Sequence, residues 1–67
     1  MSKSRIIAWE TDSNLNPTGK ERFFISRSCR EVVRQIAYEL GGQAYNYMVY
    51  LPDGTKWCAR VYEKIKT

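Results

Sequence analysis

The sequence predicts an α+β domain in which a four-stranded antiparallel sheet, in the order ββαββ, carries one helix on one face. Three observations support this fold class: a capped amphipathic segment in the middle of the chain, β-rich segments on both sides of it, and turn-forming residues within each flanking pair. With 67 residues, the chain has room for one small domain, which we expect to span residues 1–67.

The helix is expected at about residues 29–40. Ser28 and Glu31 have the spacing of a capping box, in which the serine hydroxyl accepts an early backbone N–H and the glutamate reaches back to the cap. Apolar residues then recur at three- and four-residue spacings and form one stripe: Val32, Val33, Ile36, Ala37 and Leu40. Gly41 and Gly42 supply the left-handed conformation that commonly ends a helix.

Two strands are expected before the helix, at about residues 5–11 and 21–27. The connection between them, residues 12–20, is polar and rich in turn-forming residues, so we expect it to be the mobile segment of the chain. Leu15 is an exposed apolar residue near its tip. The loop is therefore a candidate recognition element, although an ordinary surface insertion accounts for it equally well.

Two further strands are expected after the helix, at about residues 44–51 and 55–65, because both segments are rich in tyrosine, valine and tryptophan. The segment Pro52-Asp53-Gly54 between them indicates a three-residue turn. That turn predicts four cross-strand pairs: Leu51–Thr55, Val49–Trp57, Tyr47–Ala59 and Tyr45–Val61. A two-residue turn is the alternative, and it would shift the register by one residue and exchange the faces.

The preferred register divides the second hairpin between two faces. The face toward the helix is expected to hold Tyr45, Tyr47, Val49, Trp57, Ala59, Val61 and Ile65. The opposite face is expected to hold Asn46, Met48, Tyr50, Lys56, Cys58, Arg60, Tyr62 and Lys64. Because one helix covers only one side of a sheet, this second set meets solvent or a partner.

Aromatic and basic side chains alternate on the predicted open face, which makes it the main candidate binding surface. Its candidate residues are Met48, Tyr50, Lys56, Arg60, Tyr62 and Lys64. Rings can stack on unpaired bases while cations neutralise phosphates. The same residue types are favoured at protein interfaces and are also common on solvated strands. Arg30 and Arg34, one turn apart on the exposed side of the helix, are additional candidates.

The two cysteines are expected to be free thiols. Without histidine, Cys29 and Cys58 cannot complete a tetrahedral zinc site within one chain, so we expect no metal and no cofactor. Cys29 lies in the first helical turn beside Arg27 and Arg30, where the helix dipole and the charges predict a lowered thiol pKa. A role as a small packing residue is the more common one for such a cysteine.

Charge and hydropathy narrow the class of function. The formal net charge is +4 and the isoelectric point is near 9.3, which favours acidic or phosphate-bearing partners. No apolar run approaches the roughly 18 residues of a membrane span, so we expect a cytoplasmic protein with no membrane partner. The carboxylates do not converge by spacing, so we expect no enzymatic activity.

These observations predict a small non-enzymatic binding protein. We expect it to dock on host nucleic-acid-processing machinery and to inhibit or redirect it, as small phage or mobile-element regulators do, with a host protein or protein–nucleic-acid complex as its partner. One alternative is direct nucleic-acid binding on the open sheet face, with single strands favoured over duplex. The other is a homodimeric structural module that buries this face.

Overall fold

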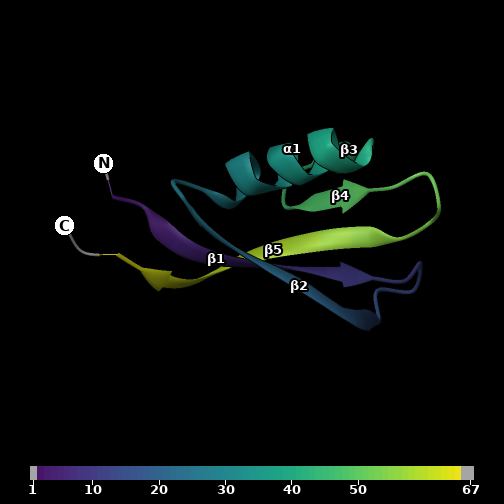
Figure 1. Cartoon of the computed structure of the whole chain (residues 1–67), viewed down its shortest axis with the longest axis horizontal. Coiled ribbons are helices and arrows are strands. Elements are labelled where there is room, and N and C mark those ends of the chain that lie inside the picture. The colour runs from purple at the N-terminus through teal and green to yellow at the C-terminus, as the bar shows by residue number, and fades with distance from the viewer. Residues whose placement is uncertain (1, 66–67) are drawn as a thin grey trace.

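A computed structural model describes residues 2–65 of the chain. Its elements are β1 (Ser4–Thr11), β2 (Pro17–Ser26), α1 (Cys29–Leu40), β3 (Gln43–Tyr45), β4 (Met48–Tyr50) and β5 (Lys56–Lys64). The strands form one antiparallel sheet in the order β2-β1-β5-β4-β3. Figure 1 shows α1 and the short β3–β4 pair above the long strands β5 and β1, with the start of β1 and the end of β5 at the same end of the molecule. The predicted α+β class is confirmed.

The predicted number of strands was wrong by one, because residues 44–51 form a tight hairpin instead of one strand. Asn46 adopts a left-handed φ of 52°, which asparagine tolerates, and the chain reverses there between β3 and β4. Tyr45 therefore pairs with Met48 and not with Val61. Tyr45 and Tyr47, which were expected against the helix, are 56% and 58% exposed, and Asn46 lies in the turn instead of on the open face.

The register of the β4–β5 connection is the predicted one. Three of the four predicted pairs are present: Val49 opposite Trp57, Leu51 with Thr55 through an N···O hydrogen bond of 3.0 Å, and Ala59 with Tyr47 through one of 3.3 Å. A three-residue turn, and not the two-residue alternative, therefore decides which side chains of β5 face the helix.

The connection between β1 and β2 is shorter than predicted, because β2 begins at Pro17 and only residues 12–16 form the turn. The Asp12 carboxylate closes this turn, since its Oδ1 accepts the backbone N–H groups of Asn14 at 2.8 Å and Asn16 at 2.9 Å. These bonds, led by the one from Asn16, hold the pKa of Asp12 below its usual value. Leu15, at the tip, is 53% exposed.

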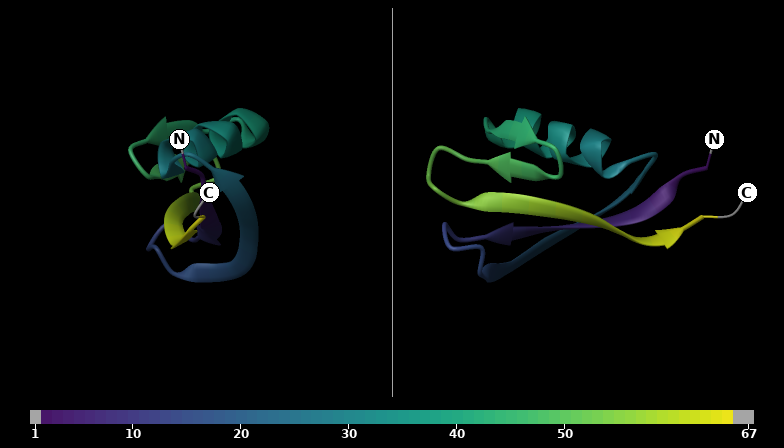
Figure 2. Two further views of the ribbon diagram at one scale, coloured as in Figure 1. Left: turned by 90° about the vertical axis from the view of Figure 1, so that its left-hand side faces the viewer. Right: turned by 180° about the vertical axis from the view of Figure 1, so that it is seen from behind.

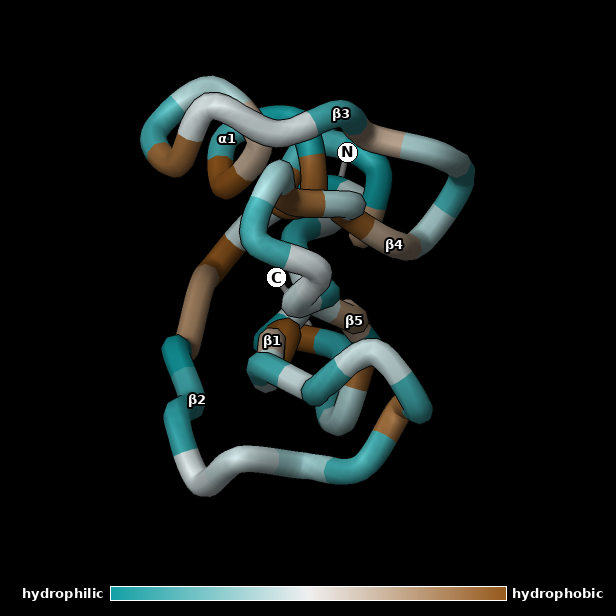
Figure 3. The backbone as a smooth tube through the Cα atoms, turned by 90° about the vertical axis from the view of Figure 1, so that its right-hand side faces the viewer, coloured by the Kyte–Doolittle hydropathy of each residue, from teal (hydrophilic) through white to brown (hydrophobic). Residues whose placement is uncertain are grey.

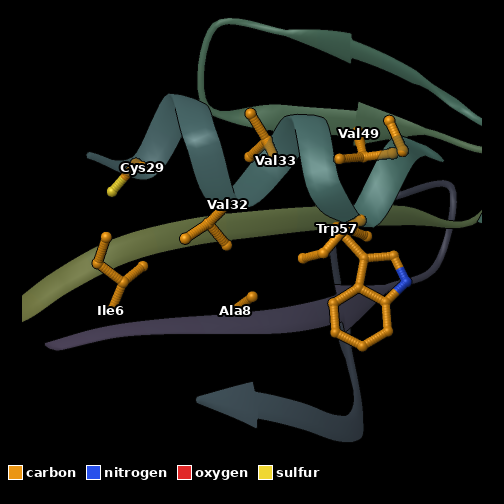
Figure 4. Close-up of a cluster of buried hydrophobic side chains, with 9 residues drawn as sticks. Ile6, Ala8, Cys29, Val32, Val33, Val49 and Trp57 are labelled. Carbon is orange, nitrogen blue, oxygen red and sulfur yellow. The ribbon is translucent and has the colours of Figure 1, made fainter. Parts of the chain in front are cut away.

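The core lies between α1 and the helix-facing side of β1, β5 and β4, as Figure 4 shows. Its buried residues are Ile6, Ala8, Cys29, Val32, Val33, Ile36, Ala37, Val49 and Trp57. The apolar stripe predicted for the helix is confirmed except at its last member, since Leu40 is 45% exposed. Within residues 2–65, the indole N–H of Trp57 is buried without a hydrogen-bond partner.

The two ends of α1 are capped much as predicted. The Ser28 hydroxyl accepts the backbone N–H of Glu31 at 3.3 Å, and Gly41 ends the helix at a φ of 72°. The Glu31 carboxylate reaches one residue further back than a capping box requires. Its Oε2 accepts the hydroxyl of Ser26 at 2.6 Å and the backbone N–H of Arg27 at 3.3 Å.

This carboxylate is expected to make stability depend on pH in the acid range. The hydrogen bond from Ser26 is the main reason that the pKa of Glu31 lies below its usual 4.5. A group with a lowered folded pKa stabilises the fold above its unfolded pKa, and this contribution is lost as pH falls through the folded value. We expect the melting temperature of the Glu31→Gln variant to fall less steeply than that of the parent protein as pH decreases below 4.5. Parallel curves for the variant and the parent protein, measured by circular dichroism, would contradict this expectation.

A bulge in the β1–β5 pair changes which side chains face the helix near the end of β5. Val61 lies opposite Ile6 and Glu63 lies opposite Arg5, so Tyr62 is the extra residue. The register beyond the bulge places Lys64 on the helix-facing side of the sheet. The expected position of Lys64 on the open face was therefore wrong. Side chains alternate between the two faces along a regular strand, and the extra residue of a bulge interrupts this alternation.

Candidate functional site

The side of the sheet that faces away from α1, called the open face below, is largely aromatic and aliphatic. Arg5, Ile7 and Trp9 of β1 lie there because Ile6 and Ala8 point into the core. The strand pairing places residues of the four remaining strands on the same face: Phe23, Ile25, Gln43, Tyr45, Met48, Tyr50, Lys56, Cys58, Arg60, Tyr62 and Glu63. Figure 3 shows the apolar end of β2 in brown at the rim of the molecule.

Two aromatic pairs shape the open face. The rings of Phe23 and Tyr62 meet edge to face with centroids 6.0 Å apart, which joins β2 to β5 across β1. The rings of Tyr45 and Tyr50 meet in the same way at 5.3 Å, which joins β3 to β4. All four side chains remain between 42% and 64% exposed. The open face therefore carries more apolar surface than an ordinary solvated sheet requires.

Most of the positive charge on the open face is engaged within the molecule. Arg5 Nε lies 2.8 Å from the Glu63 carboxylate. Lys56 Nζ lies 5.5 Å from the centre of the Tyr50 ring and donates a hydrogen bond to the Ser13 carbonyl at 3.0 Å. Both cations are thus committed to partners in the same molecule, which weakens their attraction for phosphate.

The structure brings together most of the residues that the sequence analysis selected. Met48, Tyr50, Lys56, Arg60 and Tyr62 lie on the open face, as expected. Lys64 lies on the helix-facing side, and Arg30 and Arg34 are exposed on α1. The candidates therefore form two groups on different sides of the sheet instead of one continuous surface.

Sequence reasoning missed the contribution of the first hairpin to the open face. Phe23 and Ile25 are 64% and 57% exposed, and they extend the apolar surface to the edge strand β2. The signal was present in the run Phe23-Phe24-Ile25, because three consecutive apolar residues in a strand place apolar side chains on both faces.

A second concave surface lies on the helix-facing side, between the first turn of α1 and the last residues of β5. This surface, called the basic cleft below, encloses about 490 Å³. Three cations line it from this side of the sheet: Arg27, Arg30 and Lys64. Arg60 borders it as well, but the register pairs Arg60 with Ile7 and so places its side chain on the open face. Tyr47, Cys29 and Val61 are among its other lining residues.

Both cysteines are free, as expected, but the predicted lowering of the Cys29 pKa was wrong. Cys29 is only 9% exposed, and its burial raises the pKa of the thiol above the usual 9.0 despite a backbone N–H from Val61. Burial likewise raises the pKa of the Cys58 thiol. Desolvation of the thiolate outweighs the charges of the nearby arginines, because these arginines lie in solvent.

No protein-family model matches the chain, and neither a curated protein nor a solved structure matches it at a significant level. Within residues 2–65, no helix has the length and apolar character to cross a membrane. The same residues contain no cluster of three or more side chains suited to holding a metal ion. The candidate sites therefore have to be interpreted from their own chemistry.

Proposed function

We propose that the chain is a non-enzymatic, cytoplasmic binding protein whose open face docks on a partner protein. The observation that carries this proposal is the set of exposed apolar side chains on that face, above all Ile25 and the packed pair Phe23 and Tyr62. Aromatic residues, methionine and arginine are enriched in the cores of protein interfaces. A solvated sheet would expose polar side chains at these positions.

The open face is better suited to protein than to nucleic acid. Arg5 and Lys56 have intramolecular partners, so few free cations remain there to neutralise phosphates. Ile25 offers no ring on which a base can stack. Arg60 remains as a cation beside the apolar centre, and it favours a partner surface that combines apolar side chains with a carboxylate.

A second copy of the chain is a poorer occupant of the open face. In a two-fold dimer the same patch meets itself, and β5 is the central strand of the five. Lys56 and Arg60 of one copy would then lie close to the same cations of the other. The proposed partner is therefore a different protein, which we take to belong to nucleic-acid-processing machinery that the bound domain blocks or redirects.

The proposal is tested by affinity capture from cell lysate with a matched pair of variants. Phe23→Ser combined with Tyr62→Ser removes one aromatic pair from the open face, whereas Tyr38→Ser removes a ring that is 90% exposed on α1. We expect the first variant to lose the captured protein and the second to retain it, including at about 0.5 M salt, since apolar contacts are screened little. Circular dichroism should show that both variants are folded.

Two results would count against this proposal. Capture that is unchanged in the double variant would mean that the open face is not the interface. A sedimentation mass of twice 7.9 kDa for the isolated protein, lost in the double variant, would show that the open face is covered by a second copy.

A further inference from the structure

The basic cleft exists because β5 is longer than its neighbour β4. β4 begins at Met48, opposite Cys58, and one further backbone hydrogen bond joins the two segments, from the Ala59 N–H to the Tyr47 carbonyl at 3.3 Å. β5 continues to Lys64 with β1 alone beside it. Figure 2 shows β3 and β4 beside the C-terminal part of α1, so that the first helical turn lies over the uncovered part of β5.

Three cations converge on the cleft. Arg27 comes from the connection between β2 and α1, Arg30 from the first turn of α1, and Lys64 from the end of β5. The bulge at Tyr62 turns Lys64 to this side, and bulges commonly re-aim a functional side chain. Without the bulge, Lys64 would stand on the opposite face of the sheet.

Most of the charge of the cleft is not balanced by nearby carboxylates. No acidic residue lines it, and the two ion pairs among residues 2–65, Arg5–Glu63 and Arg22–Glu39, involve none of its three cations. Arg27 is partly compensated, because its charge is one of the reasons that the pKa of Glu31 is lowered. Arg30 and Lys64 take part in neither ion pair, so a bound anion stabilises the arrangement.

The positive charge of the cleft comes mainly from side chains, since each cation carries more charge than the end of a helix. At the helix end, the Ser28 hydroxyl accepts the backbone N–H of Glu31, and the Glu31 carboxylate accepts the N–H of Arg27, which precedes the helix. Two of the three cations are arginines, and a guanidinium binds phosphate oxygens through two parallel hydrogen bonds.

The surroundings of the cleft fit a chain of phosphates better than one small anion. Arg34 follows Arg30 by four residues, about 6 Å along α1, and Tyr38 follows by four more with 90% of its surface exposed. Tyr47, at 58% exposure, places a ring beside the cations. Alternating cations and exposed rings are the elements of single-strand binding without sequence preference.

We propose that the basic cleft binds the phosphate backbone of a single-stranded nucleic acid. Arg27, Arg30 and Lys64 contact phosphates, and the ring of Tyr47 stacks against a base. This site is separate from the open face, so the domain holds a partner protein on one side and a nucleic-acid strand on the other. The cleft contains no carboxylate or amide side chain to read cytosine or adenine, and its cations are assigned to phosphates, so we expect little dependence on sequence.

The test is fluorescence anisotropy with a labelled oligothymidylate of about 12 nucleotides, a length within the usual site sizes of single-strand binders. Three phosphate contacts give a slope of about −2 in the logarithm of affinity against the logarithm of salt concentration. We therefore expect affinity to fall about 20-fold between about 50 and 200 mM salt.

Single substitutions locate the site. Lys64→Gln should make the salt slope shallower by about 0.7, whereas Lys20→Gln, the same change on β2 outside the cleft, should leave the slope unchanged. Tyr47→Ala should weaken binding about tenfold through loss of stacking, and Tyr47→Phe should restore it. Melting curves of each variant control for folding.

Several outcomes would overturn the proposal. They are absence of binding at about 50 mM salt, equal effects of Lys64→Gln and Lys20→Gln, and tighter binding of duplex DNA or of a phosphoserine peptide than of the oligothymidylate. Changes in amide chemical shifts during an NMR titration show directly where the oligonucleotide binds on the domain. Shifts at Cys29, Arg30 and Val61 support the cleft, and shifts confined to Phe23 and Ile25 place the strand on the open face instead.

Failure of this proposal and failure of the proposed function are distinguishable. Phe23→Ser with Tyr62→Ser should abolish protein capture and leave the salt slope unchanged, because neither residue lines the cleft. Lys64→Gln should make the salt slope shallower and leave protein capture unchanged.

Discussion

Replacement of Ile36 by alanine is expected to destabilise the domain by about 2–5 kcal/mol, the usual cost of such a cavity in a core. Ile36 is fully buried at the centre of the helical stripe and is among the largest of the buried side chains. A chain of this length has a total stability of only about 3–10 kcal/mol. The variant is therefore expected to be partly or wholly unfolded at 37 °C, and urea unfolding followed by tryptophan fluorescence measures the change.

A milder variant and a surface control complete this test. Ile36→Val removes one methyl group and should cost about 0.5–1.5 kcal/mol, which is measurable even if the alanine variant does not fold. Tyr38→Ala lies on the same helix at 90% exposure and should change stability by less than about 0.5 kcal/mol. A cost at Ile36 no larger than that at Tyr38 would contradict the assignment of the core.

Replacement of Gly42 by alanine is expected to cost about 1–3 kcal/mol through overpacking. A Cβ atom at this position would lie 2.6 Å from the backbone carbonyl oxygen of Tyr50 and 2.5 Å from Leu51 Cδ2. The side chain of Leu51 can move, but the carbonyl belongs to β4. The end of α1 and the β3–β4 hairpin would therefore have to separate. The midpoint of denaturant unfolding measures this cost.

The neighbouring residue provides the control for Gly42. Gln43→Ala changes an exposed side chain on the edge strand β3 and should shift stability by less than about 0.5 kcal/mol. If Gly42→Ala were as stable as the parent protein, the close packing of the helix end on β4 would be incorrect.

The helix and the β4–β5 register could be predicted because both are encoded locally. Ser28 and Gly41 mark the ends of α1 through bonds to residues within one turn. The segment 52–54 fixes its own turn geometry, and the turn then fixes the pairing of Val49 with Trp57. Interactions between residues close in sequence produce a recognisable sequence pattern, so these two features can be predicted without knowing the fold.

The β3–β4 hairpin and the bulge could not be predicted with the same reasoning. The run of residues 44–51 has β propensity throughout, and propensity does not show where a strand reverses. The chain reverses at Asn46, where β3 pairs with β4 instead of continuing beside β5. The bulge depends on how Val61 and Glu63 pair with β1, a strand about 55 residues away in sequence.

The sequence alone determined the α+β class, the helix with its apolar stripe, the register of the second turn and the basic charge, because each depends on composition or on neighbours in the chain. Only the tertiary structure decided the distribution of the candidate residues. It joined Phe23 to Tyr62 on the open face and turned Lys64 toward Arg30 at the basic cleft. The physical reason is that strand pairing and bulges are set by contacts between distant segments, and a change of one residue in register moves a side chain to the other side of the sheet.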